Sequence, residues 1–427
     1  MDAKAIERLQ PRLVAFLEPF EDCFARSESW GSLGHYVRGQ LSDLPRKSIE
    51  PIALASGVAP RCLQQFLADA KWDENRLRDK IQQRVAAGHN DPKNVGQIDE
   101  TTYAKKGKKT PGIKRQYRGS TGKKDNCVVS VHLSCSAPTG FQSLLDAELF
   151  IPEDWAADRQ RCREARRPED MVYRPKWKIA LELIDRSRGN GVRLSWVTFD
   201  EGYGNIPAFH ADLDWRSQLY VGEVPKNFHG WCQPPEPLQK AHHSQLGRKL
   251  KSTAAAASRV DKLVCYSPLF QDQPWVGFYV KDSQKGPIVW EAKVGTFYIS
   301  HNGVPGRPLL LMVARNALDR QEIKYFVSNG PPHTPTEELL RVGFSRFAIE
   351  RCFEDEKTEL GMDHFEVRNY VSLKRHLIIS SLTLLFLVQV RAQDVKKNGT
   401  DGVPGAYGGQ RHDSSVFHAA STTSMVA

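Results

Sequence analysis

The chain has 427 residues and a mass of 48.2 kDa, which is enough for two or three domains with an ample core. Lysine and arginine (60) outnumber aspartate and glutamate (50), so the net charge is +10 and the pI is near 9.1, which points to a polyanionic partner. The 8 cysteines form no Cys-x-x-Cys pair, which argues against a zinc site or a disulfide framework and favours a reducing compartment.

No membrane association is expected. The acidic N-terminus has no signal-peptide profile. The most apolar run, Leu377 to Val390, is too short to span a bilayer and is typical of a buried helix. No lipidation motif or basic amphipathic anchor accompanies the positive charge, so a nucleic acid is the favoured polyanion.

The stretch from Val95 to Lys124 combines an acidic pair with a basic segment. A short strand is predicted to end on Asp99 and Glu100, which would place a carboxylate at the edge where open α/β sheets build their sites. Nine lysines or arginines and no acid follow from Lys105 to Lys124, interrupted by glycines and a proline, so a mobile basic loop is expected. Together they suggest a metal ion beside a nucleic-acid backbone. The alternative is a solvated loop that serves solubility.

The chain falls into five predicted segments. Residues 1–90 are predicted to be helical, with a possible helix-turn-helix from Ser48 to Leu67, although a plain helical bundle fits the pattern equally well. Residues 91–224 are predicted to contain strands at 95–99, 126–133 and 143–151, a helix at 176–188, a strand ending at Asp200, a helix and a strand at 218–224. This order is that of a ribonuclease-H-like sheet, in which the first and fourth strands are neighbours, so Asp99 and Asp200 would meet.

The remaining segments complete an expected α/β fold: a ribonuclease-H-like core, a β-rich insertion and a helical N-terminal domain. Residues 225–330 are predicted to form the insertion, with a basic patch at 248–251 and strands at 275–280, 288–297, 309–314 and 323–327. Residues 331–391 are predicted to form the C-terminal helices of the core, a long one opening near Thr334 and running to about residue 360, and a second at 371–390. Residues 392–427 are expected to be a disordered tail.

The long helix carries a third candidate acid. Arg346, Glu350 and Lys357 are spaced four and seven residues apart, which places them on one face of a continuous helix. Such a face presents a carboxylate to a metal ion while its cations bind phosphates. A surface helix with ordinary ion pairs is the alternative interpretation.

Several segments, taken in order, resemble those of one family. They are Leu44-Pro45-Arg46-Lys47-Ser48-Ile49-Glu50, Ile98-Asp99-Glu100-Thr101, Lys106-Gly107-Lys108, Arg115-Gln116-Tyr117, Gly119-Ser120, Gly122-Lys123, Asp200-Glu201-Gly202-Tyr203-Gly204 and Glu359-Leu360-Gly361-Met362-Asp363-His364-Phe365-Glu366. On the basis of these segments, the chain resembles DDE-type insertion-sequence transposases, which carry an Arg-x3-Glu-x6-Lys signature. The likeness is closer to the insertion-sequence 701 branch and covers about residues 10 to 390.

The resemblance implies a site and a reaction. Asp99, Asp200 and Glu350 would be the catalytic residues and would bind two Mg²⁺ ions, for which Mn²⁺ can substitute. The reaction would cut the transposon ends and join them to target DNA. Two further sets would contact DNA: Arg346 and Lys357 near the cleaved end, and the basic residues Lys105, Lys106, Lys108, Lys109 and Arg115 along the backbone. A homodimer on double-stranded DNA in a bacterial cytoplasm, associated with the nucleoid when bound, is the implied setting.

Some choices remain between neighbouring residues. Successive strand residues point to opposite faces, so only one of Asp99 and Glu100 faces a metal, and the resemblance selects Asp99. It also selects Asp200 over Glu201, and Glu350 over Glu354. The histidines at positions 132, 210, 364 and 376 lack ligand spacing and are expected to be structural.

The family pattern is not complete. Gly343 stands where the wider signature has a tyrosine, which puts a tyrosine contact to the transposon end, and a hairpin route of cleavage, in question. Relatives use a tryptophan of the insertion to hold a flipped base. Trp275 and Trp290 are the candidates, with a buried structural role favoured for each. Two alternatives stay open: a catalytically silent DNA-binding protein, and a ribonuclease-H-like nuclease or junction resolvase that cuts without joining.

Overall fold

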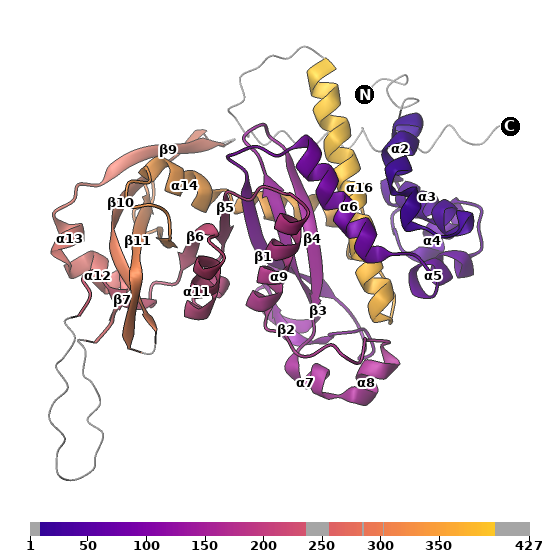
Figure 1. Cartoon of the computed structure of the whole chain (residues 1–427), viewed down its shortest axis with the longest axis horizontal. Helices are drawn as coiled ribbons and strands as arrows, with labels where there is room; N and C mark the ends of the chain where they lie inside the picture. Colours follow the sequence, from indigo (N-terminus) through magenta and orange to yellow (C-terminus); the bar gives the residue numbers. More distant parts are fainter. Residues whose placement is uncertain (1–8, 236–255, 284–285, 302, 398–427) are drawn as a thin grey trace, which may run out of the picture. The chain divides into compact units, whose positions relative to one another are not determined.

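The computed structural model describes residues 9–235, 256–283, 286–301 and 303–397. They form two compact units. The first consists of the chain up to Leu194 together with the residues from Phe347 onward, and the second is Ser195–Arg346. The elements of both are labelled along the chain in Figure 1. The basic patch expected at 248–251 lies outside the described residues.

The first unit begins with short helices. They are α2 (Leu9–Leu17), the 3-10 helix η1 (Glu18–Cys23), α3 (Ser27–Leu41), α4 (Ile49–Ala55), α5 (Pro60–Ala68) and α6 (Glu74–Gly88). Pro60 opens α5 in its first turn, and Asp73 caps α6 by accepting a hydrogen bond from the amide of Arg76 at 2.9 Å. Gly57, with φ +67°, makes the turn between α4 and α5. The two helices of the expected helix-turn-helix are therefore present, and their role on DNA remains a prediction.

An antiparallel sheet follows. Its strands are β1 (Val95–Ala104), β2 (Lys114–Arg118), β3 (Lys123–Ser136) and β4 (Gln142–Phe150), with the short η2 (Gly119–Thr121) before β3. One edge of β3 pairs with β1, and its other edge pairs with β2 and then with β4. The prediction of a mobile loop over residues 105–124 is therefore wrong for its second half, because β2 is hydrogen-bonded into the sheet. Helices α7 (Glu153–Ala157), α8 (Arg159–Glu164) and α9 (Lys176–Gly189) complete this segment.

Two C-terminal helices return to this unit, α15 (Phe347–Thr358) and α16 (Tyr370–Lys397). Helix α16 lies beside α6 and β4 (Figure 1). Its polar residues bond to the N-terminal helices, since Ser380 accepts from Gln40 at 2.8 Å, Thr383 donates to Gln40 at 2.7 Å, and Nδ1 of His376 lies 2.9 Å from the Tyr36 hydroxyl. It runs six residues into the expected tail, and the rest of the tail lies outside the described residues.

The length of α16 exceeds what the apolar run predicted. By length and composition alone, Tyr370–Asp394 could cross a membrane. The expectation that this apolar helix is too short to span a bilayer is therefore wrong. However, 78% of the apolar window is buried inside the protein. Burial of this kind, with its polar groups bonded to neighbouring helices, is that of a core helix, as the sequence predicted.

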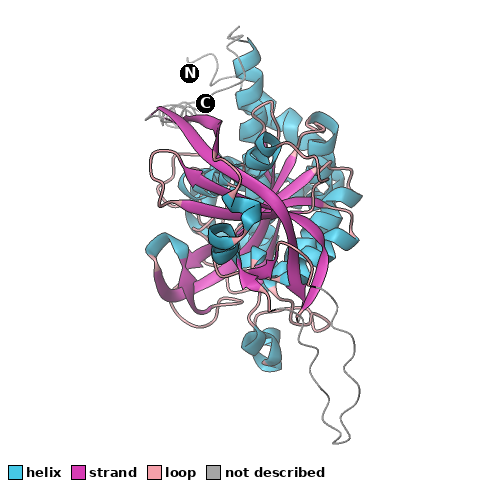
Figure 2. Ribbon diagram, turned by 90° about the vertical axis from the view of Figure 1, so that its left-hand side faces the viewer, coloured by secondary structure: helices cyan, strands magenta, loops and turns pink. Residues whose placement is uncertain are grey.

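The second unit is built on a mixed sheet. Its elements are β5 (Trp196–Phe199), α10 (Glu201–Gly204), α11 (Pro207–Trp215), β6 (Leu219–Val224), β7 (His229–Trp231), β8 (Ser258–Arg259), α12 (Val260–Tyr266), α13 (Pro268–Gln271), β9 (Val276–Ser283), β10 (Gly286–His301), β11 (Val304–Asn316), β12 (Ile323–Ser328) and α14 (Thr336–Phe344). The strand order is β5-β6-β12-β11-β10-β7-β8, with β9 also paired to β10. Figure 2 separates these strands, in magenta, from the helices. The four strands expected in the insertion are present.

The insertion continues the sheet of the core. Strands β5 and β6 are parallel, and β12 then pairs antiparallel with β6, so that Tyr325 lies opposite Val224. Along the chain, the order of strands and helices from β1 to β6 is the one expected for a ribonuclease-H-like core, and the α/β fold class is confirmed. The single helix expected from about residue 334 to 360 is wrong, because Ser345 and Arg346 form a turn between α14 and α15.

Candidate active site

Asp99 lies in the middle of β1, and not at its end. The strand continues to Ala104, and Asp99 pairs with His132 of β3 in the antiparallel register. The expectation of a strand ending in a carboxylate is therefore wrong here, because the residues after Glu100 extend the ladder. Directly opposite residues of an antiparallel pair share a face, so Asp99 and the fully buried His132 lie on the same side of the sheet. Oδ1 of Asp99 accepts a hydrogen bond from the amide of Glu100 at 2.7 Å.

Helix α15 packs on that same side of β1. The ring of Phe353 lies 5.0 Å from the ring of His132, and Nζ of Lys357 donates to Oγ1 of Thr101 at 2.6 Å. Thr101 is two residues from Asp99, so both side chains point toward the helix. Glu100 points to the other face, where Lys176 at the start of α9 lies 2.6 Å from its carboxylate. Within the first unit, Asp99 and not Glu100 therefore faces α15.

Glu350 occupies the helical face of α15 that is turned toward β1. It is seven residues from Lys357, two turns along the same face, and its side chain is exposed. Since Phe353 is level with His132, and thus with Asp99, Glu350 lies about one turn further along the helix. Glu354, the alternative candidate for the third acid, forms a surface ion pair with Arg351 at 2.8 Å. The first unit thus carries Asp99 and Glu350 on the same side of β1.

Asp200 belongs to the second unit and follows directly after β5. Its carboxylate caps α10, accepting hydrogen bonds from the amides of Gly202 at 3.0 Å and Tyr203 at 3.3 Å. The glycine at 202 fits this turn, because a Cβ there would lie 3.2 Å from Oδ1 of Asp200. Glu201 sits in the first turn of α10, where burial and then Glu223 raise the pKa of its carboxyl. The strand-end position expected for the second acid is therefore observed at Asp200.

Arg346 and Lys357 do not share a helical face. Arg346 lies in the turn before α15, so the geometry expected for a continuous helix is wrong at its N-terminal end. Lys357 is directed at β1, and burial lowers the pKa of its amine. Gly343, in α14, is packed so closely that a Cβ would lie 3.1 Å from Phe326 and 3.3 Å from Val221. This packing leaves little room for a side chain at position 343.

The basic segment divides into two kinds of lysine. Lys105 donates to the carbonyls of Asp363 at 2.9 Å and Phe365 at 2.6 Å, and burial lowers the pKa of its amine to about 8. Four other predicted DNA-binding residues are exposed: Lys106, Lys108, Lys109 and Arg115. These four carry exposed positive charge, whereas Lys105 fixes the end of β1 to the segment before α16.

Two of the recognised segments, residues 44–50 and 359–366, contact one another. The amide of Lys47 donates to Nδ1 of His364 at 3.0 Å, and its amine donates to the carbonyls of Gln40 and Glu359. Arg46 forms an ion pair with Glu366. Residues 363–366 therefore join the N-terminal helices to the core, and the structural role expected for His364 is observed. No local pattern indicates this pairing, since more than 300 residues separate the partners.

The candidate tryptophans differ. Trp290 is 4% exposed, and its ring lies 4.7 Å from the ring of Phe344, so the expected structural role is confirmed. Trp275 is only partly buried, and the cations of Arg315 and Lys293 lie 4.1 Å and 4.9 Å from its ring. The expectation that Trp275 is buried is wrong, because it precedes an edge strand, β9, and is covered by side chains rather than by a second layer.

The chemistry of the three acids suits a hard divalent cation, which prefers oxygen ligands. The four histidines examined in the sequence are engaged elsewhere: His132 with Ser130 and Tyr103, His210 with the Gly204 carbonyl, His364 with Lys47 and His376 with Tyr36 and Met362. Over the described ranges, no group of three or more histidine, cysteine or acidic side chains is arranged to hold a metal ion.

The sequence did not show that Glu356 is buried, and it indicated only a structural role for His132. His132 is buried, and burial lowers the pKa of its imidazole to about 3, so it is neutral at physiological pH. Glu356 is buried on α15, and neither of its carboxylate oxygens has a hydrogen-bond partner among the described residues. A polar residue on the inward face of a helix is the only signal that marked Glu356. For His132 the alternating strand pattern gave its face but not its neighbour.

With this geometry, the chain can be compared with known proteins. A sequence profile described as DDE superfamily endonuclease matches residues 19–273, more than half of the chain, and the chain belongs to that family. The match ends before Glu350, so it covers two of the three acids.

A curated relative narrows the resemblance. The chain is 28% identical over 241 residues to a protein of Microchaete diplosiphon named "Probable transposase for insertion sequence element IS701". The aligned region is 54% of this chain and 60% of that relative. The resemblance to insertion-sequence transposases of the 701 branch is thereby confirmed. Among solved structures, the NurA nuclease from Sulfolobus solfataricus gives a TM-score of 0.24 at 10% identity, over 68% of this chain and 92% of that one, a likeness too low to support an argument.

Proposed function

We propose that this protein is an active transposase that cuts the ends of its insertion sequence and joins them to target DNA. The observation that carries the proposal is the placement of Asp99 and Glu350 on the same side of β1, in a chain that belongs to the DDE superfamily endonucleases. Asp200, at the end of β5, supplies the third carboxylate. The relative from Microchaete diplosiphon supports transposition as the biological setting.

Asp99, Asp200 and Glu350 would hold two divalent ions, with Mg²⁺ favoured by their oxygen donors. When bound, such ions supply a nucleophilic hydroxide at neutral pH and neutralise charge on the leaving oxygen. The protein's own contribution is to position these carboxylates and the DNA. Lys106, Lys108, Lys109 and Arg115 would bind backbone phosphates, with Arg346 nearer the cleaved end. Lys357 would hold the face of β1 that carries Asp99.

A cleavage assay tests this function. The substrate is a duplex carrying the inverted repeats that flank the gene, with Mg²⁺ or with EDTA, and binding of the same duplex is measured in parallel. We expect Asp99→Asn and Asp200→Asn to abolish metal-dependent cleavage while binding survives. Glu100→Gln is the matched control, because its side chain faces α9, and it should cleave normally. Cleavage by Asp99→Asn at the wild-type rate would remove that residue from the site.

Strand joining needs a separate assay. Pre-cut ends are incubated with a supercoiled target plasmid, and covalently joined products are sought. Joined products would exclude a nuclease that only cuts, and their absence alongside efficient cleavage would favour it. Two ends must be held together for joining, so we propose that the enzyme acts as a homodimer on DNA. Mass measurement of the protein with and without paired ends checks this.

A further inference from the structure

The β1–β2 connection, residues 105–113, contains no helix or strand but is held in place by the residues around it. Its first half carries exposed lysines, and its second half is buried. In the buried half, Gly112 adopts φ +74°, and a Cβ there would lie 2.8 Å from the carbonyl oxygen of Phe150 in β4. The connection therefore packs closely on the sheet at one end and presents its lysines at the other.

Two side chains bind carbonyl oxygens at the ends of the β1–β2 connection. Nδ2 of Asn126, in β3, donates to the carbonyls of Lys105 at 2.9 Å and Gly107 at 2.8 Å. Nε1 of Trp155, in α7, donates to the carbonyl of Ile113 at 2.9 Å. A connection with two glycines and a proline has many conformations available to it, so these hydrogen bonds restrict the backbone from which the lysines project.

Arg161 holds the middle of the connection. It lies in α8, and its Nη2 donates to the carbonyl of Lys108 at 3.0 Å. Its guanidinium carbon lies 4.0 Å from the centre of the Trp155 ring, which stacks against the cation. Trp155 is itself 1% exposed, so Arg161 rests on a rigid support in the core. Arg161 therefore fixes the backbone at the point where the exposed lysines stand.

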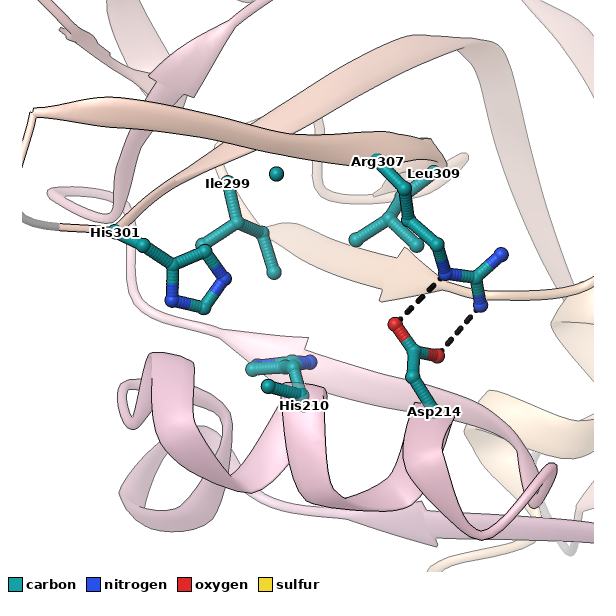
Figure 3. A pocket seen from close by; sticks show the side chains of 8 residues that line it. His210, Asp214, Ile299, His301, Arg307 and Leu309 are labelled. Atoms are coloured by element: carbon teal, nitrogen blue, oxygen red, sulfur yellow. Dashed lines mark hydrogen bonds and ion pairs between the residues drawn. The ribbon is translucent and has the colours of Figure 1, made fainter.

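The charge of Arg161 is not neutralised by this arrangement. In the second unit, by contrast, Arg307 binds both carboxylate oxygens of Asp214 (Figure 3). Within the described part of the chain, no carboxylate pairs with Arg161, and the neighbouring connection adds three exposed lysines. Like charges repel, so this placement disfavours the free protein and favours a bound polyanion.

We propose that Arg161 is a positioning residue for DNA binding: it orders the β1–β2 connection so that Lys106, Lys108 and Lys109 are already in place when they meet the phosphates of a duplex. The inference rests on the proposed function and adds to it a residue that acts through others. Because the lysines are held before binding, less conformational entropy is lost on contact with DNA. Loss of Arg161 should therefore weaken DNA binding without changing the number of phosphates contacted.

Salt dependence separates positioning from direct contact. The affinity of the full-length protein for duplex DNA is measured at several salt concentrations. Arg161→Met keeps a long side chain over Trp155 but removes the donor, and it should bind about fivefold more weakly at every salt concentration. The slope of the logarithm of the association constant against the logarithm of salt concentration should not change. Arg163→Met is the matched control: it removes the same charge from an exposed position of α8 and should bind as the wild type does.

Trypsin digestion tests the ordering without DNA. Trypsin cleaves after lysine, so cuts at residues 106–109, identified by mass spectrometry, report opening of the connection. Arg161→Met should be cut there faster than the wild type, and Arg163→Met should not. Asn126→Ala removes the bonds to Lys105 and Gly107, and as an independent variant it should behave as Arg161→Met in both assays. Melting temperatures establish that each variant is folded.

Four results would overturn the proposal. A shallower salt slope in Arg161→Met means that Arg161 contacts phosphate itself. Equal weakening by Arg163→Met means that only the charge of α8 matters. Unchanged digestion means that Arg161 does not order the connection, and faster digestion with unchanged affinity means that it serves the fold alone. Each of these leaves the cleavage assay of the proposed function unaffected, whereas failure of the wild type to bind DNA contradicts both proposals before any variant is compared.

Discussion

Asp99 and Asp200 are the same side chain on two strands, but their surroundings differ. Asp99 is held within the ladder of β1, opposite a buried histidine and below α15. Asp200 follows the last residue of β5 and caps a helix. The position of Asp99 is fixed by long-range packing, because its neighbours come from β3 and α15. The position of Asp200 is fixed locally, by hydrogen bonds from amides two and three residues away. Mutations should therefore affect the two positions in different ways.

The largest expected effect is on the rate of DNA cleavage and concerns Glu350, which lies on the same side of β1 as Asp99. Glu350→Gln should reduce cleavage by about 10³-fold, because loss of a metal ligand costs several kcal/mol in the transition state. Glu354→Gln is the matched control, since that side chain is paired at the surface with Arg351. Rates are measured on the same end duplex at saturating Mg²⁺. If Glu354→Gln is the inactive variant, the assignment of the third acid is wrong.

The next effect concerns the exposed lysines that follow β1, which have no counterpart after Asp200. Loss of one exposed lysine should make the salt dependence of DNA binding less steep. The slope of the logarithm of the DNA association constant against the logarithm of salt concentration should fall in magnitude by about 0.9 in Lys106→Gln, Lys108→Gln or Lys109→Gln, because each lost phosphate contact releases one fewer counterion. Lys178→Gln changes an exposed lysine of α9 and should leave the slope unchanged. Affinities for duplex DNA at several salt concentrations give these slopes. Equal slopes for all four variants would contradict the proposed interface.

A third effect follows from Glu356, also on the packed side of β1. Burial raises the pKa of its carboxyl well above the ordinary value of 4.5. The folded chain therefore keeps a proton that the unfolded chain releases as pH rises above 4.5. The contribution of this proton to the stability of the folded chain is complete below pH 4.5 and is lost as pH rises through the folded pKa. Glu356→Gln should be more stable than the wild type by about 2 kcal/mol at pH 8, and less so at pH 5. Urea denaturation at both pH values measures this, and an unchanged pH dependence would exclude a buried proton there.

The smallest effect separates the two roles of Asp200. Asp200→Ala removes the cap of α10 and should lower stability by about 1 kcal/mol, whereas Asp200→Asn keeps a capping side chain and should change stability little. Both variants lack the carboxylate and should be inactive in cleavage. Thermal denaturation and the cleavage assay together separate capping from catalysis. Asp99→Ala offers the comparison, since its carboxylate caps no helix in the described structure.

Local pattern was enough for much of the fold. The alternating residues of β3, the four strands of the insertion, and helix α9 closed by a glycine were predicted close to their observed positions, because burial of one face imposes a period on the sequence. Asp200 at the end of β5 was also predicted, since a buried-looking strand that ends in an aspartate is a local signal, whereas its capping of α10 is seen only in the structure. Membership of the DDE superfamily endonucleases followed from ordered motifs.

Tertiary structure decided the rest. That β1 continues past Asp99 depends on pairing with β3, and that β2 is a strand depends on the same partner. The amine of Lys105 is committed to carbonyls more than 250 residues away, and Lys357 is turned inward to Thr101. Hydrogen bonds of that kind form between residues that the chain brings together only on folding, so no local period records them. The sequence determined which side chains are candidates for the chemistry, and packing determined which of these candidates are held by contacts within the protein.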